Sequence, residues 1–110
     1  MSQLHYFKGN SIASPSMDTF ICILDGRQIT LLQDFYDEIA KGLKLPDYFG
    51  QNLDALDEML YDLDWIEERN ILVIVLHGSE FLSEDVMARD EILNLFEQID
   101  NPYLEFIFIQ

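Results

Sequence analysis

Three short apolar runs, the last of them interrupted by Glu105, constrain the fold of this 110-residue chain more than any other feature. Each run is rich in Ile, Val, Leu or Phe and lies next to turn-forming residues; the runs are residues 20–24, 71–76 and 104–109. Runs of this kind are typical of strands that are buried on both faces of a sheet. Because helical patterns separate them, we expect an α/β fold: a small three-stranded parallel sheet flanked by helices, with right-handed crossovers and residues 71–76 at its centre.

Helical patterns fill the segments between the runs. The first begins at Thr30-Leu31-Leu32-Gln33, which matches a capping box, and ends near Lys44. The second follows Asn52, a residue type favoured at helix N-caps. The third covers about residues 90–100 and ends at an Asn-Pro pair.

Length and composition predict one domain. We assign residues 20–110 to it and regard residues 1–19 as an N-terminal extension of unassigned role, because Gly, Asn, Ser and Pro interrupt every period there. Within the extension, residues 4–7 either add an edge strand or pack as an arm. A chain of this size buries roughly 60–70% of its unfolded surface, so it requires neither a disulfide nor a metal.

The formal net charge of −15 limits the partners of the protein. Such a charge repels nucleic acid phosphates and anionic membranes and favours a basic protein partner. The alternative is that the acidity serves solubility alone. The charge is uneven, since eight carboxylates and no Lys or Arg lie between residues 45 and 68. This clustering favours a binding role.

The sequence lacks the residue patterns of an enzyme. Its histidines are His5, in the extension, and His77, at a strand end, and neither lies in a catalytic motif. Phosphate-cradling Gly loops and metal-binding His or Cys spacings are absent from the sequence. The carboxylates between residues 54 and 64 match neither a calcium loop nor the facing pair of a glycoside hydrolase. We therefore expect no catalytic residue, no metal and no cofactor.

Cysteine usage and the N-terminal sequence indicate where the protein acts. Cys22 is the single cysteine and lies within an apolar run, as is typical of a buried free thiol. The first residues lack the basic start and apolar region of a secretory signal, and no apolar run approaches the roughly 20 residues of a membrane span. We expect a cytoplasmic protein.

The second helix and the loop before it combine aromatic residues with carboxylates. Periodicity places an apolar stripe on one side and acidic residues on the other. Asp54 with Glu58, and Glu58 with Asp62, are like-charge pairs at i,i+4, each disfavouring the helix by a few tenths of a kcal/mol. The candidate partner-binding residues are Tyr48, Phe49, Asn52, Asp54, Asp57, Glu58, Tyr61 and Asp62.

Several of these candidates also have a purely structural interpretation. Phe49, next to Gly50 in a turn, is suited to hold the loop against the core. Asn52 is suited to cap the helix. Asp57 and Asp62 fit an ordinary solvated helix face.

The run Leu45-Pro46-Asp47-Tyr48-Phe49-Gly50-Gln51-Asn52-Leu53-Asp54-Ala55-Leu56 resembles the signature of the barstar family, inhibitors of the ribonuclease barnase. The resemblance extends as a pattern from about residue 20 to residue 109. It implies a three-stranded parallel sheet with helices, in which the second helix and its loop plug a nuclease active site. It further implies that Tyr48 packs against catalytic residues, Asp54 reaches a basic groove and Glu58 takes the place of a substrate phosphate.

The sequence departs from the family pattern on the contact face. The family has Asp where this chain has Glu58, Trp at Asp57, Thr at Tyr61 and an acidic residue at Gln98. We therefore expect an immunity protein against a basic ribonuclease or nuclease toxin other than barnase, acting as a monomer in a 1:1 complex. The alternative is a barstar-like binding module for another basic protein, such as a nuclease toxin of unrelated fold.

Overall fold

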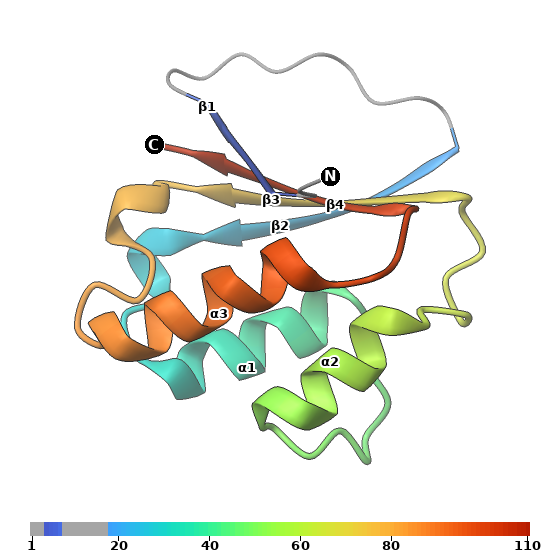
Figure 1. The fold of residues 1–110 in the computed structure, drawn as a ribbon, viewed down its shortest axis with the longest axis horizontal. Helices are drawn as coiled ribbons and strands as arrows, with labels where there is room; N and C mark the ends of the chain where they lie inside the picture. Colours follow the sequence, from blue (N-terminus) through green and yellow to red (C-terminus); the bar gives the residue numbers. More distant parts are fainter. Residues whose placement is uncertain (1–3, 8–17) are drawn as a thin grey trace.

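The structure, a computed structural model, describes residues 4–7 and 18–110, which form a parallel sheet covered by helices (Figure 1). The strand order is β1-β4-β3-β2. The strands are β1 (Leu4–Phe7), β2 (Thr19–Asp25), β3 (Asn70–Leu76) and β4 (Leu104–Ile109). The predicted α/β class, the parallel pairing and the central position of residues 71–76 are confirmed. The sheet has four strands rather than three, because residues 4–7 pair with β4, from Leu4 opposite Phe106 to Phe7 opposite Ile109.

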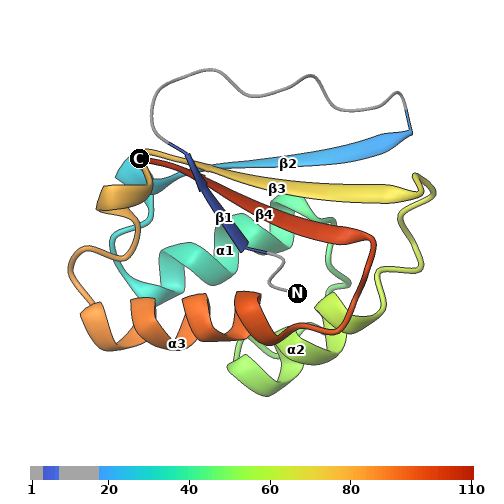
Figure 2. The ribbon, with the colours of Figure 1, turned by 45° about the horizontal axis from the view of Figure 1, so that its top comes forward.

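The three helices of the described residues all lie on one face of this sheet (Figures 1 and 2). They are α1 (Leu32–Gly42), α2 (Leu53–Tyr61) and α3 (Val86–Gln98), and short 3-10 turns occupy Gly26–Gln28 and Gly78–Glu80. The expectation that residues 20–24 are buried on both faces is therefore wrong. Cys22 and Leu24 face the helices and are 2% exposed, whereas Ile23 on the opposite face is 61% exposed.

Two helix starts differ from the sequence prediction. Thr30 does not cap α1; instead the Asp34 carboxylate accepts the backbone N–H groups of Thr30 and Leu31 at 3.3 and 3.0 Å. The third helix begins four residues before the predicted start because Asp85 caps it, accepting the Ala88 N–H at 3.1 Å. In both cases a side-chain carboxylate satisfies N–H groups that have no partner within the helix.

An aromatic core joins the helices to the sheet. Phe96 of α3 stacks on Phe106 of β4 with ring centroids 3.9 Å apart, and Phe35 of α1 meets Phe81 edge-on at 5.6 Å. All four side chains are fully buried. This packing fixes α1 and α3 on the sheet, and α2 lies beside them at the end of the helical layer (Figures 1 and 2). None of the helices in the described residues has the length and apolar composition needed to cross a bilayer.

Cys22 of β2 lies against Gly42, the last residue of α1. A Cβ atom on Gly42 would overlap the Cys22 Sγ, so only glycine allows this contact. The thiol is 2% exposed. Its burial, with a smaller contribution from the Glu38 carboxylate, raises the pKa of Cys22 from 9.0 to about 12.

The Cys22 thiol should make the protein less stable at alkaline pH. The unfolded chain releases its thiol proton near pH 9, whereas the folded chain retains it up to about pH 12. Within this window the free energy of unfolding should fall by about 1.4 kcal/mol per pH unit on account of this group. Urea denaturation at a series of pH values from 8 to about 12 measures this slope.

Cys22→Ala is the control for this prediction. Tyr36, whose pKa is also raised by burial, remains in the variant and keeps its share of the slope. The difference between wild type and Cys22→Ala therefore isolates the thiol. Identical slopes in the two proteins would contradict the assignment.

Candidate protein-binding site

The loop before α2 is anchored on α1 at both of its ends. The Leu45 N–H donates to the Ala40 carbonyl at 2.9 Å, which fixes the loop as it leaves α1. Farther along, Phe49 is 9% exposed and packs edge-on against Tyr36, with ring centroids 6.0 Å apart. Phe49 thus lies in the core, in accord with the structural interpretation of this residue, and its neighbour Tyr48 is left 79% exposed.

Gln51 ties the end of the loop to the outside of α1. Its amide accepts a hydrogen bond from Gln33 at 2.8 Å and donates one to Asp37 at 3.1 Å, and Gln33 also donates to Asp37 at 3.0 Å. The Gln51 backbone has φ 48°, in the left-handed region that non-glycine residues rarely adopt. The three side chains therefore hold a sharp turn just before α2 begins.

α2 starts at a capped and electrostatically favourable end. The Asn52 side chain accepts the Ala55 N–H at 2.8 Å and donates to the Gly50 carbonyl at 3.1 Å. Asp54 lies in the first turn, where the helix dipole stabilises a carboxylate by about 0.3–1 kcal/mol. Leu56 and Leu60 are fully buried. The helix is thus fixed along its apolar side, as its sequence pattern predicts.

The opposite side of α2 is a continuous exposed surface, which we call the acidic face. Its members are Asp54, Asp57, Glu58, Tyr61 and Asp62. All five are exposed, with Tyr61 at 62%, and Tyr48 on the preceding loop is 79% exposed. Asp62 is the C-cap of the helix, so a negative charge lies at the end where the dipole is also negative.

The carboxylates of the acidic face have no cationic partner among the residues that the structure describes. The ion pairs found there join His5 to Glu105, Arg27 to Asp25 and Lys41 to Glu38, all outside α2. The last turn of α2 contains no basic residue. Repulsion along the helix is therefore uncompensated within the described part of the protein, and a cationic surface would relieve it.

The C-terminal end of α2 is held by a residue that the sequence did not single out. Asn101, 8% exposed, donates its side-chain amide to the Leu60 carbonyl at 3.0 Å and accepts the Tyr103 N–H at 3.1 Å. Its sequence signal was limited to the Asn-Pro pair that ends the third helix. At the same end, the Trp65 indole donates to the Leu43 carbonyl at 2.9 Å.

Asn52→Ala should destabilise the protein by about 1 kcal/mol, within a range of roughly 0.5–2, because the Ala55 N–H loses its acceptor. Asn52→Asp should retain most of the stability, since a carboxylate accepts the same bond and favours the helix dipole. Urea denaturation of the three proteins measures both changes. Equal stability of wild type and Asn52→Ala would show that the cap has no role.

Comparison with known proteins identifies the family of this chain. The family model described as "Barstar (barnase inhibitor)" matches residues 19–106. The chain is also 31% identical over 77 residues to the Bacillus subtilis (strain 168) protein named "Putative ribonuclease inhibitor YrdF", covering 69% of this chain and 80% of that protein. The family match and this relative show that the chain belongs to the barstar (barnase inhibitor) family.

Proposed function

We propose that the protein is an inhibitor of a basic ribonuclease and that the acidic face of α2 blocks the active site of that enzyme. The family match supports a ribonuclease inhibitor of the barstar kind. The observation that carries the proposal is that the carboxylates of the acidic face have no cationic partner within residues 4–7 and 18–110, while Tyr48 on the preceding loop is 79% exposed. Such a surface is complementary to a cationic, RNA-binding cleft.

The proposed mechanism is imitation of RNA. An enzyme that binds a polyanion presents Lys and Arg side chains to its phosphates, and carboxylates on a fixed helix accept the same charge-assisted hydrogen bonds. The hydrogen bonds that anchor both ends of α2 limit the ordering cost of binding. Glu58 lies in the middle of the face, one turn after Asp54, and is proposed to occupy a phosphate position.

Tyr48 and Tyr61 are proposed as aromatic anchors. Their rings are 79% and 62% exposed, so a partner would bury a large area of each. Phe49 and Asn52 are proposed to act indirectly, because one is buried against Tyr36 and the other caps α2. The inhibitor is proposed to act as a monomer, in the cytoplasm, in a 1:1 complex, and to perform no catalysis itself.

The decisive test is inhibition of a basic ribonuclease purified from the organism that makes the protein. RNA cleavage should fall to zero at one equivalent of the protein, and the association rate should drop steeply as salt rises, because the attraction is between exposed charges. Calorimetry should give a stoichiometry of one. Undiminished cleavage in the presence of excess protein would refute the proposal.

A second candidate function is a barstar-like module for another basic protein. Asp57, Tyr61 and Gln98, which differ from the family pattern, favour it because Asp57 and Tyr61 belong to the acidic face and Gln98 is exposed on α3. A nuclease toxin of unrelated fold is the proposed alternative partner. Loss of its activity upon mixing, without inhibition of barnase-type ribonucleases, would select this function.

A further inference from the structure

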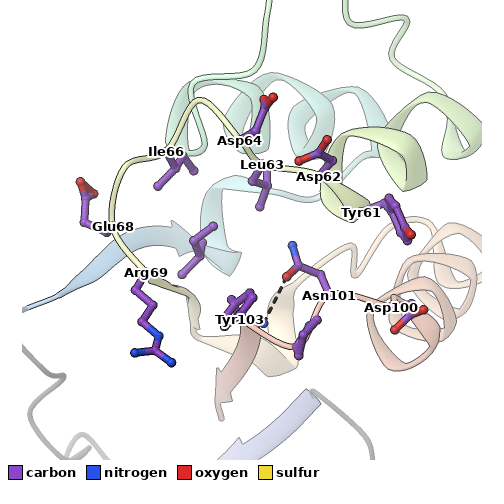
Figure 3. Close-up of a pocket in the computed structure, with 12 residues that line it drawn as sticks. Tyr61, Asp62, Leu63, Asp64, Ile66, Glu68, Arg69, Asp100, Asn101 and Tyr103 are labelled. Carbon is purple, nitrogen blue, oxygen red and sulfur yellow. Dashed lines mark hydrogen bonds between the residues drawn. The ribbon is translucent and has the colours of Figure 1, made fainter.

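The two ends of α2 are held in different ways. At the C-terminal end, the buried side chain of Asn101 donates to the Leu60 carbonyl at 3.0 Å and accepts from Tyr103, and Figure 3 marks the second of these bonds. At the N-terminal end, exposed side chains join Gln51 to α1. Hydrogen bonds between exposed groups replace bonds to water and add little to stability. The support at the N-terminal end therefore calls for an explanation other than stability.

Three side chains form this support, which we call the amide bridge: Gln33 and Asp37 of α1, and Gln51 of the loop. Gln33 donates from Nε2 to the Gln51 Oε1 at 2.8 Å and to the Asp37 Oδ1 at 3.0 Å, and Gln51 donates from Nε2 to the same Asp37 oxygen at 3.1 Å. Each member is thus bonded to the other two. Because Gln33 and Asp37 are four residues apart on a helix, they lie on the same side of it. The bridge therefore fastens the end of the loop to the exposed side of α1.

The backbone of Gln51 is strained although a glycine stands next to it. Its φ of 48° lies in the left-handed region, which glycine adopts readily and a residue with a Cβ atom rarely does. Gly50 does not adopt this conformation. A glycine at position 51 would remove the strain, but it would have no amide to bond to α1. Strained conformations of this kind concentrate at functional sites. We therefore ascribe the presence of glutamine at this position to its side chain.

The amide bridge fixes the backbone on which Tyr48 stands. The loop is fastened to α1 before Tyr48, through the Leu45 N–H at 2.9 Å, and after it, through Gln51. Since the Tyr48 residue is 79% exposed, the position of its ring depends mainly on this backbone. Gln51 also directly precedes the N-cap Asn52, so the bridge fixes the start of α2, whose first turn contains Asp54. A loop without the bridge would have to be ordered when the partner binds, which lowers affinity.

We propose that Gln33, Asp37 and Gln51 are positioning residues for the binding of the ribonuclease. They order the loop that carries Tyr48 before the two proteins meet, and so raise affinity without contact with the enzyme. This inference rests on the proposed function, and it gives α1 a part in binding that the acidic face does not include. The Asp37 carboxylate then acts as a hydrogen-bond acceptor within the inhibitor, whereas Glu58 acts by attraction of the basic enzyme.

Two substitutions of Asp37 separate these roles, because both remove the same charge. Asp37→Asn keeps an oxygen that accepts from Gln33 and Gln51, whereas Asp37→Ala does not. Gln33→Ala also breaks the bridge, without a change in charge and with a residue that favours helix. Inhibition titration with a purified basic ribonuclease measures binding. Hydrogen exchange of the Phe49 N–H, which is bonded to the Pro46 carbonyl at 2.9 Å, measures the order of the loop in the free protein, and urea denaturation measures global stability.

Asp37→Ala and Gln33→Ala should each weaken inhibition, and speed exchange of the Phe49 N–H, by about tenfold, because each loses two hydrogen bonds of the bridge. Asp37→Asn should remain within about twofold of wild type in both measurements. Equal weakening by Asp37→Asn and Asp37→Ala would show that the carboxylate acts by its charge, and the positioning proposal would be overturned.

The same titration distinguishes failure of the positioning proposal from failure of the proposed function. If the three variants inhibit as wild type does while Glu58→Gln is weakened, the amide bridge has no part in binding and the proposed function stands. If the wild-type protein does not inhibit the enzyme, the proposed function fails, and the positioning proposal falls with it.

Discussion

Replacing Glu58 by glutamine should weaken binding of the target ribonuclease by about 2–5 kcal/mol, the usual loss when one member of a buried charge pair is removed. The same variant should be slightly more stable than wild type when free. Glu58 stands one turn after Asp54, and this like-charge pair disfavours the helix by about 0.2–0.5 kcal/mol. Asp62 adds no such pair, because it is the C-cap of α2 with an extended backbone. Calorimetry with the ribonuclease and urea denaturation of the free protein measure the two effects.

Asp54→Asn distinguishes the effect of a carboxylate on binding from its effect on the stability of α2. It should also weaken binding of the ribonuclease. In the free protein, two effects on stability oppose each other. The helix loses the favourable charge in its first turn, about 0.3–1 kcal/mol, but the repulsion between Asp54 and Glu58 is also removed. Its stability should therefore stay near that of wild type. Glu91→Gln on α3, exposed and outside the acidic face, is the control and should alter neither the affinity nor the stability. Wild-type affinity in both Glu58→Gln and Asp54→Asn would show that the acidic face is not the contact surface.

Phe96→Ala should lower the free energy of unfolding by about 3–5 kcal/mol, which is a large part of the stability of a domain of this size. The Phe96 ring is fully buried, stacks on Phe106 at 3.9 Å and lies 6.0 Å from Phe35. Its removal leaves a cavity where α1, α3 and β4 meet, and the walls are held by the sheet and cannot close it fully. Urea denaturation, or the thermal midpoint, measures the loss.

Met87→Ala on the same helix is the matched comparison. Met87 is 77% exposed, so its truncation should change stability by no more than about 0.5 kcal/mol. Phe96→Leu should lie between the two, because it retains apolar volume but loses the ring stack. A loss below about 1 kcal/mol in Phe96→Ala would mean that α3 contributes little to the core.

The strands that consist of apolar runs were predictable from the sequence. β2, β3 and β4 fall within one residue of the predicted segments. β1 was left undecided between a strand and an arm, because four residues give no clear period and its partner β4 lies about a hundred residues away in the chain. Local sequence patterns carry no information about a pairing between strands so far apart in the chain.

The layer structure was harder to predict than the strands. A continuous apolar run indicates burial on two faces, yet Ile21 and Ile23 of β2 lie on the face opposite the helices and are 39% and 61% exposed. Composition alone does not reveal which face the helices occupy. The start of α1 was misassigned for a related reason, since Thr30 and Asp34 are both good capping residues and only the geometry selects Asp34.

The candidate site was predictable where it follows helical periodicity. The exposed side of α2 and its cap at Asn52 were expected from spacing and residue type, and the structure places them so. The support of the C-terminal end of α2 was not expected. It depends on Asn101, which is about forty residues beyond α2 in sequence and comes to it through the packing of α3 and β4.

The position of β4 in the sheet has a consequence for how the protein is made. β4 is paired on one side with β3 and on the other with β1, so it joins the first described strand of the chain to the rest of the sheet. During synthesis on the ribosome, β1 is made before the other described strands, and its sheet neighbour is missing until residues 104–109 follow. Asn101, which holds the end of α2, emerges almost as late. The nascent chain therefore completes both the described sheet and the support of its acidic helix only after residues 101–109 have been synthesised, some forty residues after α2 itself.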